Sequence, residues 1–501
     1  MKPAQAAAGP TTYDATQISP PQYGYPIATS APQRVPILSS QYSVERRTPD
    51  DAEHEKVKRE KDSPDQLHSA PKYNVDHQSI CFFVNLFCYQ GQKRYDFPVL
   101  DFLPSMMEDF GSDSAASKAA LAVSRMSLAD QYSGTDVRLQ TGHEYGEALV
   151  MASKRLRDPT KAYDDDTFLA VWLLSTYEAV QSILNHRRIG QTRTLEEEWQ
   201  SHISHVRGAM QLMKMRGSSQ LRTPQGEKMY RVFKAAIQMR LFILNSVTSR
   251  EFDEMEMDVW KEEHEFTPSK TANTATAFFH KVARLIEKIN AFLFARRQSD
   301  DDEAFIKQAN EFISYGESVD KEMVDWSKHE DYWDSMPIQS PAKGTTWAIY
   351  PTLAQCWFFS PWVYLYWIRF HIGRLKLYEA LIELSQMNAT SPAATEATKL
   401  ADSLQIESYK LHIRSAASAL IGMTAYAIGD VSNRGTFNSA ASGKWPGRTF
   451  QEINVVAALQ LVIPLKACLR SEHTTADQKG AIDLAITHIG DGLRRQPLHV
   501  A

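Results

Sequence analysis

Apolar residues recur at helical spacing along most of this 501-residue chain, and this periodicity constrains the fold more than any other feature. In residues 196–217, apolar side chains follow one another at steps of four, three, four and three, the spacing of one face of an α-helix. These side chains are Trp199, Ile203, Val206, Met210 and Met213, and the helix is expected to end at Gly217. Strict strand-like alternation is almost absent. The sequence therefore predicts an all-α fold.

The same spacing returns in segments on both sides of this helix. Residues 168–183 are apolar on most sides and are expected to be buried, and the aspartates before them suit a helix N-terminus. We expect helix capping to explain Asp164 and Asp165. Further helical segments follow, separated by irregular breaks rich in Gly, Pro and Ser. The prediction is a large irregular array of ten or more helices.

The N-terminal part of the chain has a different composition. Residues 1–75 are rich in Pro, Ser, Gln, Ala and charge and show no apolar period. Such a segment buries too little apolar surface to offset the entropy lost on ordering. We therefore expect a disordered segment over 1–75, followed by a helical domain over 76–501.

One short motif lies within that segment. The sequence VKREKDSP at residues 57–64 resembles a phosphorylation-dependent sumoylation motif, with Lys58 as acceptor and Ser63 as phosphorylation site. A phosphate on Ser63 would add nearly two negative charges that a basic patch on the conjugating enzyme can read. The alternative interpretation is a solvated linker of mixed charge.

Charge and cysteine content exclude some classes of protein. The net charge of −5 gives no global bias toward nucleic acid. The four cysteines are scattered, which indicates a reducing compartment rather than a disulfide framework. No apolar signal-peptide core follows the first lysine.

One apolar run is long enough to span a bilayer. Residues 344–368 contain no charged side chain, but Pro351 and Pro361 interrupt them. Buried helices of large proteins have similar compositions. We expect a core helix here, and no contact with a membrane.

Residues that bear chemistry do not form a recognisable catalytic pattern. Glu198, His202 and His205 lie on adjacent helical turns, but a di-iron site needs a second Glu-x-x-His helix, and none is found. Glycine-rich phosphate loops and the nucleophile motif of hydrolases are also missing. We therefore expect the histidines to be neighbours of a packing stripe, and predict no enzyme activity, metal or cofactor.

Three helical segments carry a family resemblance. They are YGEALVMASKRLRDP, DDDTFLAVWLLSTYEAV and SHISHVRGAMQLMKMRG, in that order along the chain. Together they resemble the regulatory domain of fungal zinc-cluster transcription factors, over roughly residues 80–495. The resemblance implies a nuclear transcription regulator that acts through a helical domain, with a protein partner or a second copy of itself, on a metabolic or biosynthetic pathway.

The sequence departs from that family in one respect. The family's DNA-binding module is held by six closely spaced cysteines, whereas here no cysteine precedes Cys81. We expect DNA contact only indirectly, or through a zinc cluster not present in this sequence. Either the chain begins downstream of that module or the protein works without it.

The resemblance also implies, for some members, the sensing of a small apolar effector. Aromatic side chains favour such ligands, and the aromatic segment is the candidate pocket. Its residues are Trp347, Tyr350, Trp357, Phe358, Trp362 and Tyr366. The alternative is that these rings fill the core. Two other functions stay open: an enzyme or binding protein for an apolar metabolite, and a scaffold without an effector.

Overall fold

A computed structural model of the chain describes residues 75–88, 100–128, 135–186, 195–243, 270–296, 302–329, 336–338, 355–358, 361–428 and 455–494. All of these residues belong to one compact unit, Pro71–Ala501. The segment predicted to be disordered, with Lys58 and Ser63, lies outside the described residues except for Val75. Its disorder and its modification motif stay predictions.

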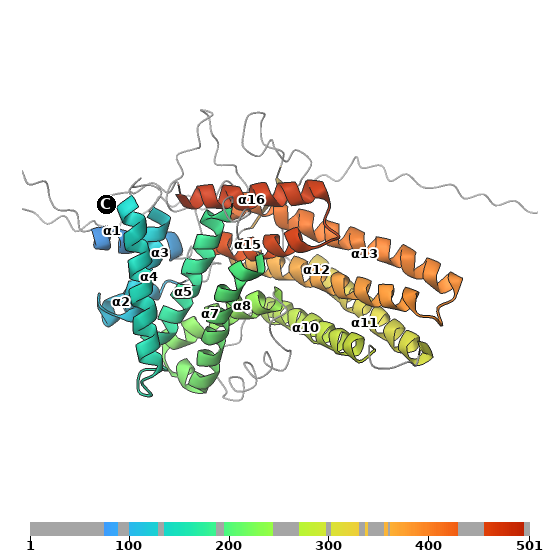
Figure 1. Cartoon of the computed structure of the whole chain (residues 1–501), viewed down its shortest axis with the longest axis horizontal. Helices are drawn as coiled ribbons and strands as arrows, with labels where there is room; N and C mark the ends of the chain where they lie inside the picture. Colours follow the sequence, from blue (N-terminus) through green and yellow to red (C-terminus); the bar gives the residue numbers. More distant parts are fainter. Residues whose placement is uncertain are drawn as a thin grey trace, which may run out of the picture. The chain divides into compact units, whose positions relative to one another are not determined.

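The first group of helices packs around α5 (Figure 1). Helix α3 packs against both α4 and α5, and α7 packs against both α5 and α8. The bounds are α1 (Val75–Phe87), α2 (Leu103–Phe110), α3 (Ala115–Leu128), α4 (Thr135–Leu156), α5 (Asp165–Leu184), α7 (Leu195–Arg216), the 3-10 helix η2 (Gly217–Arg222) and α8 (Pro224–Ile243).

The second group contains four long helices that lie side by side in Figure 1. Helix α12 contacts the other three, α10, α11 and α13. Helices α15 and α16 then contact both groups, since α15 packs on α12 and α8, and α16 packs on α13 and α5. The bounds are α10 (Lys270–Arg296), α11 (Asp302–His329), α12 (Pro361–Thr390), α13 (Glu396–Gly422), α14 (Thr424–Ala427), α15 (Val455–Arg470) and α16 (Ala476–Arg494). The prediction of an all-α array with ten or more helices is confirmed.

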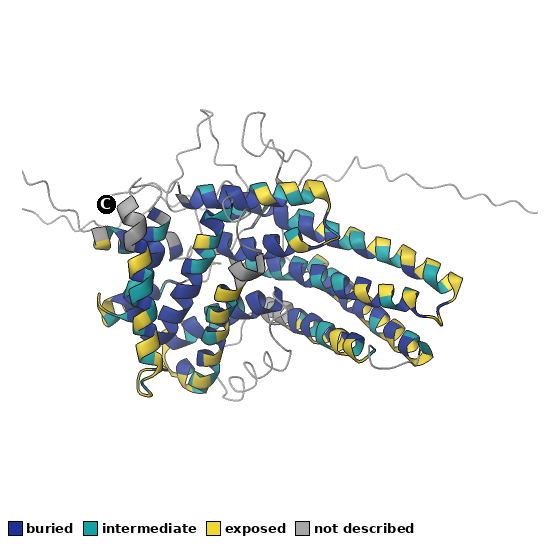
Figure 2. Cartoon of the chain, in the orientation of Figure 1, coloured by how far each residue is buried: buried dark blue, intermediate teal, exposed yellow. Residues whose placement is uncertain are grey.

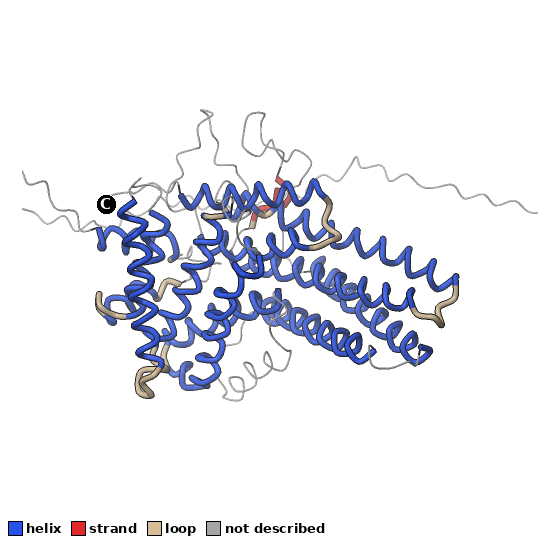
Figure 3. Tube along the Cα trace, in the orientation of Figure 1, coloured by secondary structure: helices blue, strands red, loops and turns tan. Residues whose placement is uncertain are grey.

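The aromatic run 344–368 is not the single core helix that we expected. Its described part contains strand β2 (Gln355–Trp357), which pairs antiparallel with β1 (Met336–Ile338) and is drawn in red in Figure 3. Helix α12 begins only at Pro361. Proline suits the first turn of a helix and disfavours helical geometry in the residue before it, so the helix starts where the proline stands.

Helix α5 forms much of the core of the first group. Figure 2 shows it largely in the colour of buried residues, and Phe168, Leu169 and Val180 are at most 1% exposed. Among the described helices, α5 alone is long and apolar enough to cross a membrane by length and composition, and 78% of that window is buried inside the protein. The predicted burial of residues 168–183 is confirmed in its main part.

The aspartates at the start of α5 act differently from the prediction. Asp164 and Asp165 do not cap the helix with their side chains; Asp164 pairs with Arg155 at 3.0 Å, and Asp165 pairs with Arg216. Asp166 accepts a hydrogen bond of 2.8 Å from the backbone N–H of Ala116, so it caps α3. Arg155 on α4 and Arg216 on α7 lie beside this N-terminus. The two carboxylates pair with these arginines instead of accepting hydrogen bonds from the backbone of α5.

Two glycines have backbone reasons to be glycine. Helix α7 ends at Arg216, and Gly217 follows it with a φ of 54°, in the left-handed region that favours glycine. Gly226 lies in the first turn of α8, and a Cβ added to it would stand 2.1 Å from the carbonyl oxygen of Gln220. Only a residue without a side chain fits against that carbonyl.

Candidate functional site

Of the two histidines of α7, His202 is buried and His205 is half-buried. Val206, Met210 and Met213 are buried as predicted, and Ile203 is half-buried; the side chain of Trp199 lies outside the description. His205 Nε2 lies 3.3 Å from Glu178 Oε1. The described residues contain no group of three or more His, Cys, Asp or Glu side chains that could hold a metal ion.

Glu178 on α5 joins this face to α4. Its Oε1 also accepts a hydrogen bond of 2.7 Å from the hydroxyl of Tyr145 and another from Ser201. Burial alone would raise the pKa of Glu178, but the hydrogen bonds from His205, Ser201 and Tyr145 hold it below its usual value. The carboxylate is therefore ionised and fully engaged on one oxygen.

The predicted aromatic pocket is only partly within the described residues. Phe358 is 0% exposed, and its ring centroid lies 5.4 Å from that of Tyr364 and 5.2 Å from that of Tyr426, so it fills the core. Tyr366 is half-buried, with the guanidinium of Arg369 6.0 Å from its ring centroid. Trp347 and Tyr350, and the side chains of Trp357 and Trp362, lie outside the description. The aromatic pocket stays a prediction.

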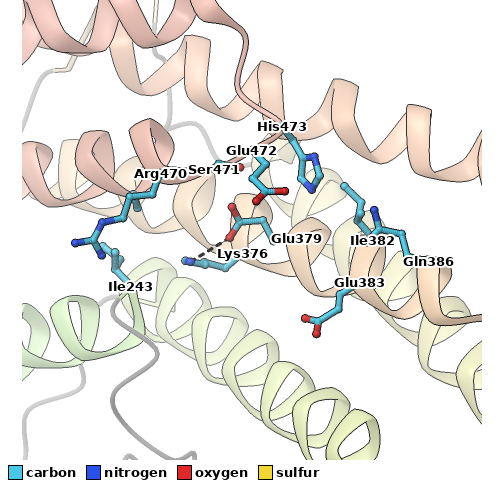
Figure 4. Close-up of a pocket in the computed structure, with 11 residues that line it drawn as sticks. Ile243, Lys376, Glu379, Ile382, Glu383, Gln386, Arg470, Ser471, Glu472 and His473 are labelled. Carbon is cyan, nitrogen blue, oxygen red and sulfur yellow. Dashed lines mark hydrogen bonds and ion pairs between the residues drawn. The ribbon is translucent and has the colours of Figure 1, made fainter. Parts of the chain in front are cut away.

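The structure instead shows a pocket where α8, α12 and the turn between α15 and α16 meet (Figure 4). Its volume is about 380 Å³, which suits a small ligand. Most of its lining is polar or charged. The lining residues are Ile243, Lys376, Glu379, Ile382, Glu383, Gln386, Ala467, Arg470, Ser471, Glu472 and His473.

Charges of both signs face this pocket. Lys376 Nζ lies 3.0 Å from Glu379 Oε2, whereas Glu383 and Glu472 are exposed. Burial, aided by the nearby cations Lys410 and Arg414, lowers the pKa of His473, so its ring is neutral at pH 7. The pocket can hold a small polar molecule.

A second polar cluster lies inside the first group of helices. Arg240 on α8 is 2% exposed, and its guanidinium stacks 4.6 Å from the ring centroid of Trp172. One terminal nitrogen of Arg240 donates to Ser175 Oγ at 3.3 Å, and its buried Nε has no hydrogen-bond partner. Burial lowers the pKa of Arg240 to about 10, so the side chain is still charged at pH 7.

Two further nitrogen bases belong to this cluster, which we call the buried cationic centre. His202 Nδ1 lies 3.2 Å from the carbonyl oxygen of Ser175, and Lys466, 1% exposed, donates to the hydroxyl of Ser182. Burial, with the charges of Arg240 and Lys466, lowers the pKa of His202 well below its usual value. The centre thus holds two cations and a neutral histidine.

Two other arginines whose side chains are 12% and 4% exposed, Arg374 and Arg125, have a carboxylate beside them. Arg374 Nε lies 2.5 Å from Asp320 Oδ1, and Tyr378 donates to Oδ2 of the same aspartate at 2.6 Å. Arg125 lies 2.6 Å from Glu144. Arg240 differs from both, because none of the carboxylates in the described part of the chain pairs with it.

Neither the pocket nor the buried cationic centre was predicted from the sequence. A signal for the centre is nevertheless present: Arg240 interrupts the apolar run AAIQMRLFIL, and Lys466 interrupts LVIPLKACL. A cation within the buried stripe of a helix rarely occurs without a functional or structural reason. The pocket has no such signal, since its residues come from helices distant in sequence.

Comparison with known proteins gives one match. A family profile described as "Fungal specific transcription factor domain" matches residues 87–412. This range begins at the end of α1 and ends within α13, so it covers both groups of helices. Neither the curated proteins nor the solved structures give a match.

Proposed function

The chain belongs to the fungal specific transcription factor domain family, and from this premise we propose that it regulates transcription through its helical domain. The observation that carries the proposal is the family match over residues 87–412, which follows the same helices that the structure describes. The family supports action in the nucleus, and we propose nuclear localisation for this chain.

We further propose that the domain responds to a small ligand that sets its regulatory output. The pocket of about 380 Å³ supports this idea, because it is concave and carries oriented polar groups. Its charged lining favours a polar ligand. An apolar effector held by the aromatic residues Trp347 to Tyr366 remains the proposal made from the sequence.

Protein association is part of the same proposal, with a second copy of the chain as partner. Three leucines on α13 support it: Leu400, Leu404 and Leu411 are 64%, 67% and 62% exposed and lie close to one helical face. Exposed leucines so grouped mark association surfaces. The molar mass of the purified chain in solution, measured by light scattering, tests this step, and a monomer at micromolar concentration would contradict it.

The regulatory role is tested by joining the full chain to a heterologous DNA-binding domain in a fungal host. We expect expression of a reporter with matching sites to change relative to the DNA-binding domain alone. A second fusion, with Lys376→Met and Glu383→Gln, changes two charged residues of the pocket, and a different reporter level from this fusion would support a role of the pocket in the regulatory output. A reporter indifferent to the fused chain, with the chain excluded from nuclei, would contradict the proposed function.

A further inference from the structure

We propose that the buried cationic centre binds a small oxyanion, a carboxylate or a phosphate group, with Arg240 as its main contact. The site lies where α5, α7, α8 and α15 meet inside the protein. It is separate from the pocket in Figure 4, whose lining includes neither Arg240 nor Lys466.

The charge of Arg240 calls for a counterion. A guanidinium stays protonated in proteins, so Arg240 cannot escape burial by losing its proton. Burying such a charge without a paired anion is costly, and buried charges are therefore normally paired. Arg240 has one long hydrogen bond to a neutral hydroxyl and a stacking contact with Trp172. These two contacts leave its charge without an anion.

Nearby charges increase this imbalance. A second cation contacts the same helix: Lys466 donates to Ser182 on α5, and Arg240 donates to Ser175 on α5. The carboxylate one turn along α5, Glu178, is held by His205 and Tyr145 on the other side. An oxyanion beside Arg240 would neutralise a charge with which none of the described carboxylates pairs.

The hydrogen-bond donors around Arg240 suit an anion with oxygen atoms better than they suit a halide ion. A guanidinium offers N–H groups in a planar fork that matches the two oxygens of a carboxylate or phosphate. The guanidinium carbon of Arg240 lies 4.6 Å from the ring centroid of Trp172, and the buried Nε of Arg240 has no hydrogen-bond partner, so this N–H is available to an oxyanion. The hydroxyl of Ser175 is positioned by the same guanidinium and can donate to an anion beside it.

The link to regulation rests on the proposed function, whereas binding itself does not. Ile243 and Ala467 line the pocket in Figure 4, and each follows a residue of the buried cationic centre closely in sequence, Arg240 on α8 and Lys466 on α15. A bound anion would therefore stabilise the two helix ends that form one wall of the pocket. The bound anion would thus hold this wall of the pocket in the conformation that binds the effector.

The test uses the purified full chain in Tris-chloride buffer. Denatured wild-type protein is analysed by ion chromatography for released carboxylates and phosphate, and its thermal midpoint is followed in added acetate, phosphate or sodium chloride at equal ionic strength. We expect a released oxyanion, or a midpoint that rises with acetate or phosphate above the chloride control. A response to acetate alone identifies a carboxylate, and a response to phosphate alone identifies a phosphate.

Variants separate binding from folding. Arg240→Met should remain folded and lose the response, and Arg240→Lys, which keeps the charge but not the fork, should weaken binding about tenfold. Arg374→Met, at a paired arginine, should keep the oxyanion response. If wild type releases no oxyanion and shows no midpoint shift, water satisfies Arg240 and the proposal is wrong. An unchanged response in both Arg240 variants would also overturn it. None of these readouts depends on transcription, so they fail or succeed independently of the proposed function.

Discussion

Arg374 and Arg240 are arginines with little exposure, one in each group of helices, and their surroundings differ. Arg374 on α12 is clamped by Asp320 on α11, which also accepts from Tyr378. Arg240 on α8 meets a serine hydroxyl and a tryptophan ring. The first arrangement is complete within the chain and fixes α11 against α12. The second is electrostatically incomplete within the described residues, which is why we assign it to ligand binding rather than to packing.

The comparison shows how a buried charge that stabilises the fold can be distinguished from a buried charge that binds a ligand. A buried ion pair adds little net stability, since desolvation offsets attraction, yet removing one partner is strongly destabilising. A buried charge that lacks a partner within the chain behaves in the opposite way, because removing it relieves a cost. The sign of the response to substitution therefore distinguishes the two regions.

The largest effect is expected at the paired region. Asp320→Ala leaves the guanidinium of Arg374, whose side chain is 12% exposed, and the hydroxyl of Tyr378 without their acceptor, and should lower the free energy of unfolding by about 3–5 kcal/mol. Guanidinium-induced unfolding measures the change. Asp325→Ala, on the same helix at an exposed pair with Lys328, is the control and should cost less than about 0.5 kcal/mol. Equal losses in the two variants would remove the distinction.

A smaller loss is expected at the start of α5. Asp166→Ala removes the side chain that caps α3 at Ala116 and contacts Arg155, and should cost about 2 kcal/mol. Asp164→Ala is the matched control, because Asp164 pairs with the same arginine from a more exposed position. Denaturant unfolding should show the larger shift for Asp166. Were Asp164 equally important, the α3 cap would not be the cause.

The neutral His202 gives the region around Arg240 a dependence of its stability on pH. Its pKa in the folded protein is depressed, so the unfolded chain takes up the proton first as pH falls. The contribution of His202 is therefore fully present above about pH 6.5 and is lost below it, at up to about 1.4 kcal/mol per pH unit. Comparing unfolding at pH 7 and pH 5.5 in wild type and His202→Asn isolates it from other histidines. A variant with an unchanged slope would contradict the burial of a neutral ring.

The smallest change in the free energy of unfolding is expected for Arg240→Met, and the sign of this change is informative. In chloride buffer its free energy of unfolding should lie within about 1 kcal/mol of wild type, or above it, because a buried unpaired charge is replaced by an apolar chain of similar length. Arg374→Met should instead lose about 3 kcal/mol, since it strands Asp320. Chemical denaturation of both variants under the same conditions measures the two changes in the free energy of unfolding. Similar losses would show that the two arginines have the same structural role.

Local patterns carried most of what the sequence predicted. The spacing of Val206, Met210 and Met213 identifies the buried face of α7 because helical periodicity depends only on neighbours in sequence. The start of α12 at Pro361 was open to the same local reasoning, but the apolar length of the run favoured a continuous helix. Fold class and family followed from such local signals.

Long-range pairings could not be predicted in the same way. Asp166 meets Ala116 across fifty positions, and Arg240 meets Ser175 across sixty-five. Nothing in a single sequence indicates which distant side chain faces a given carboxylate. The charged pocket and the buried cationic centre both depend on such pairings, so only the structure brings their residues together.

Gly226 has a consequence for how much sequence change the domain tolerates. A Cβ at position 226 would clash with the carbonyl oxygen of Gln220. Alanine at this position should therefore destabilise the fold about as much as tryptophan does. Saturation mutagenesis should thus find a position where size and polarity of the replacement hardly matter, in contrast to graded tolerance at neighbours such as Lys228. A glycine at the equivalent position of a distant family member would therefore indicate that the junction between η2 and α8 has the same structure there.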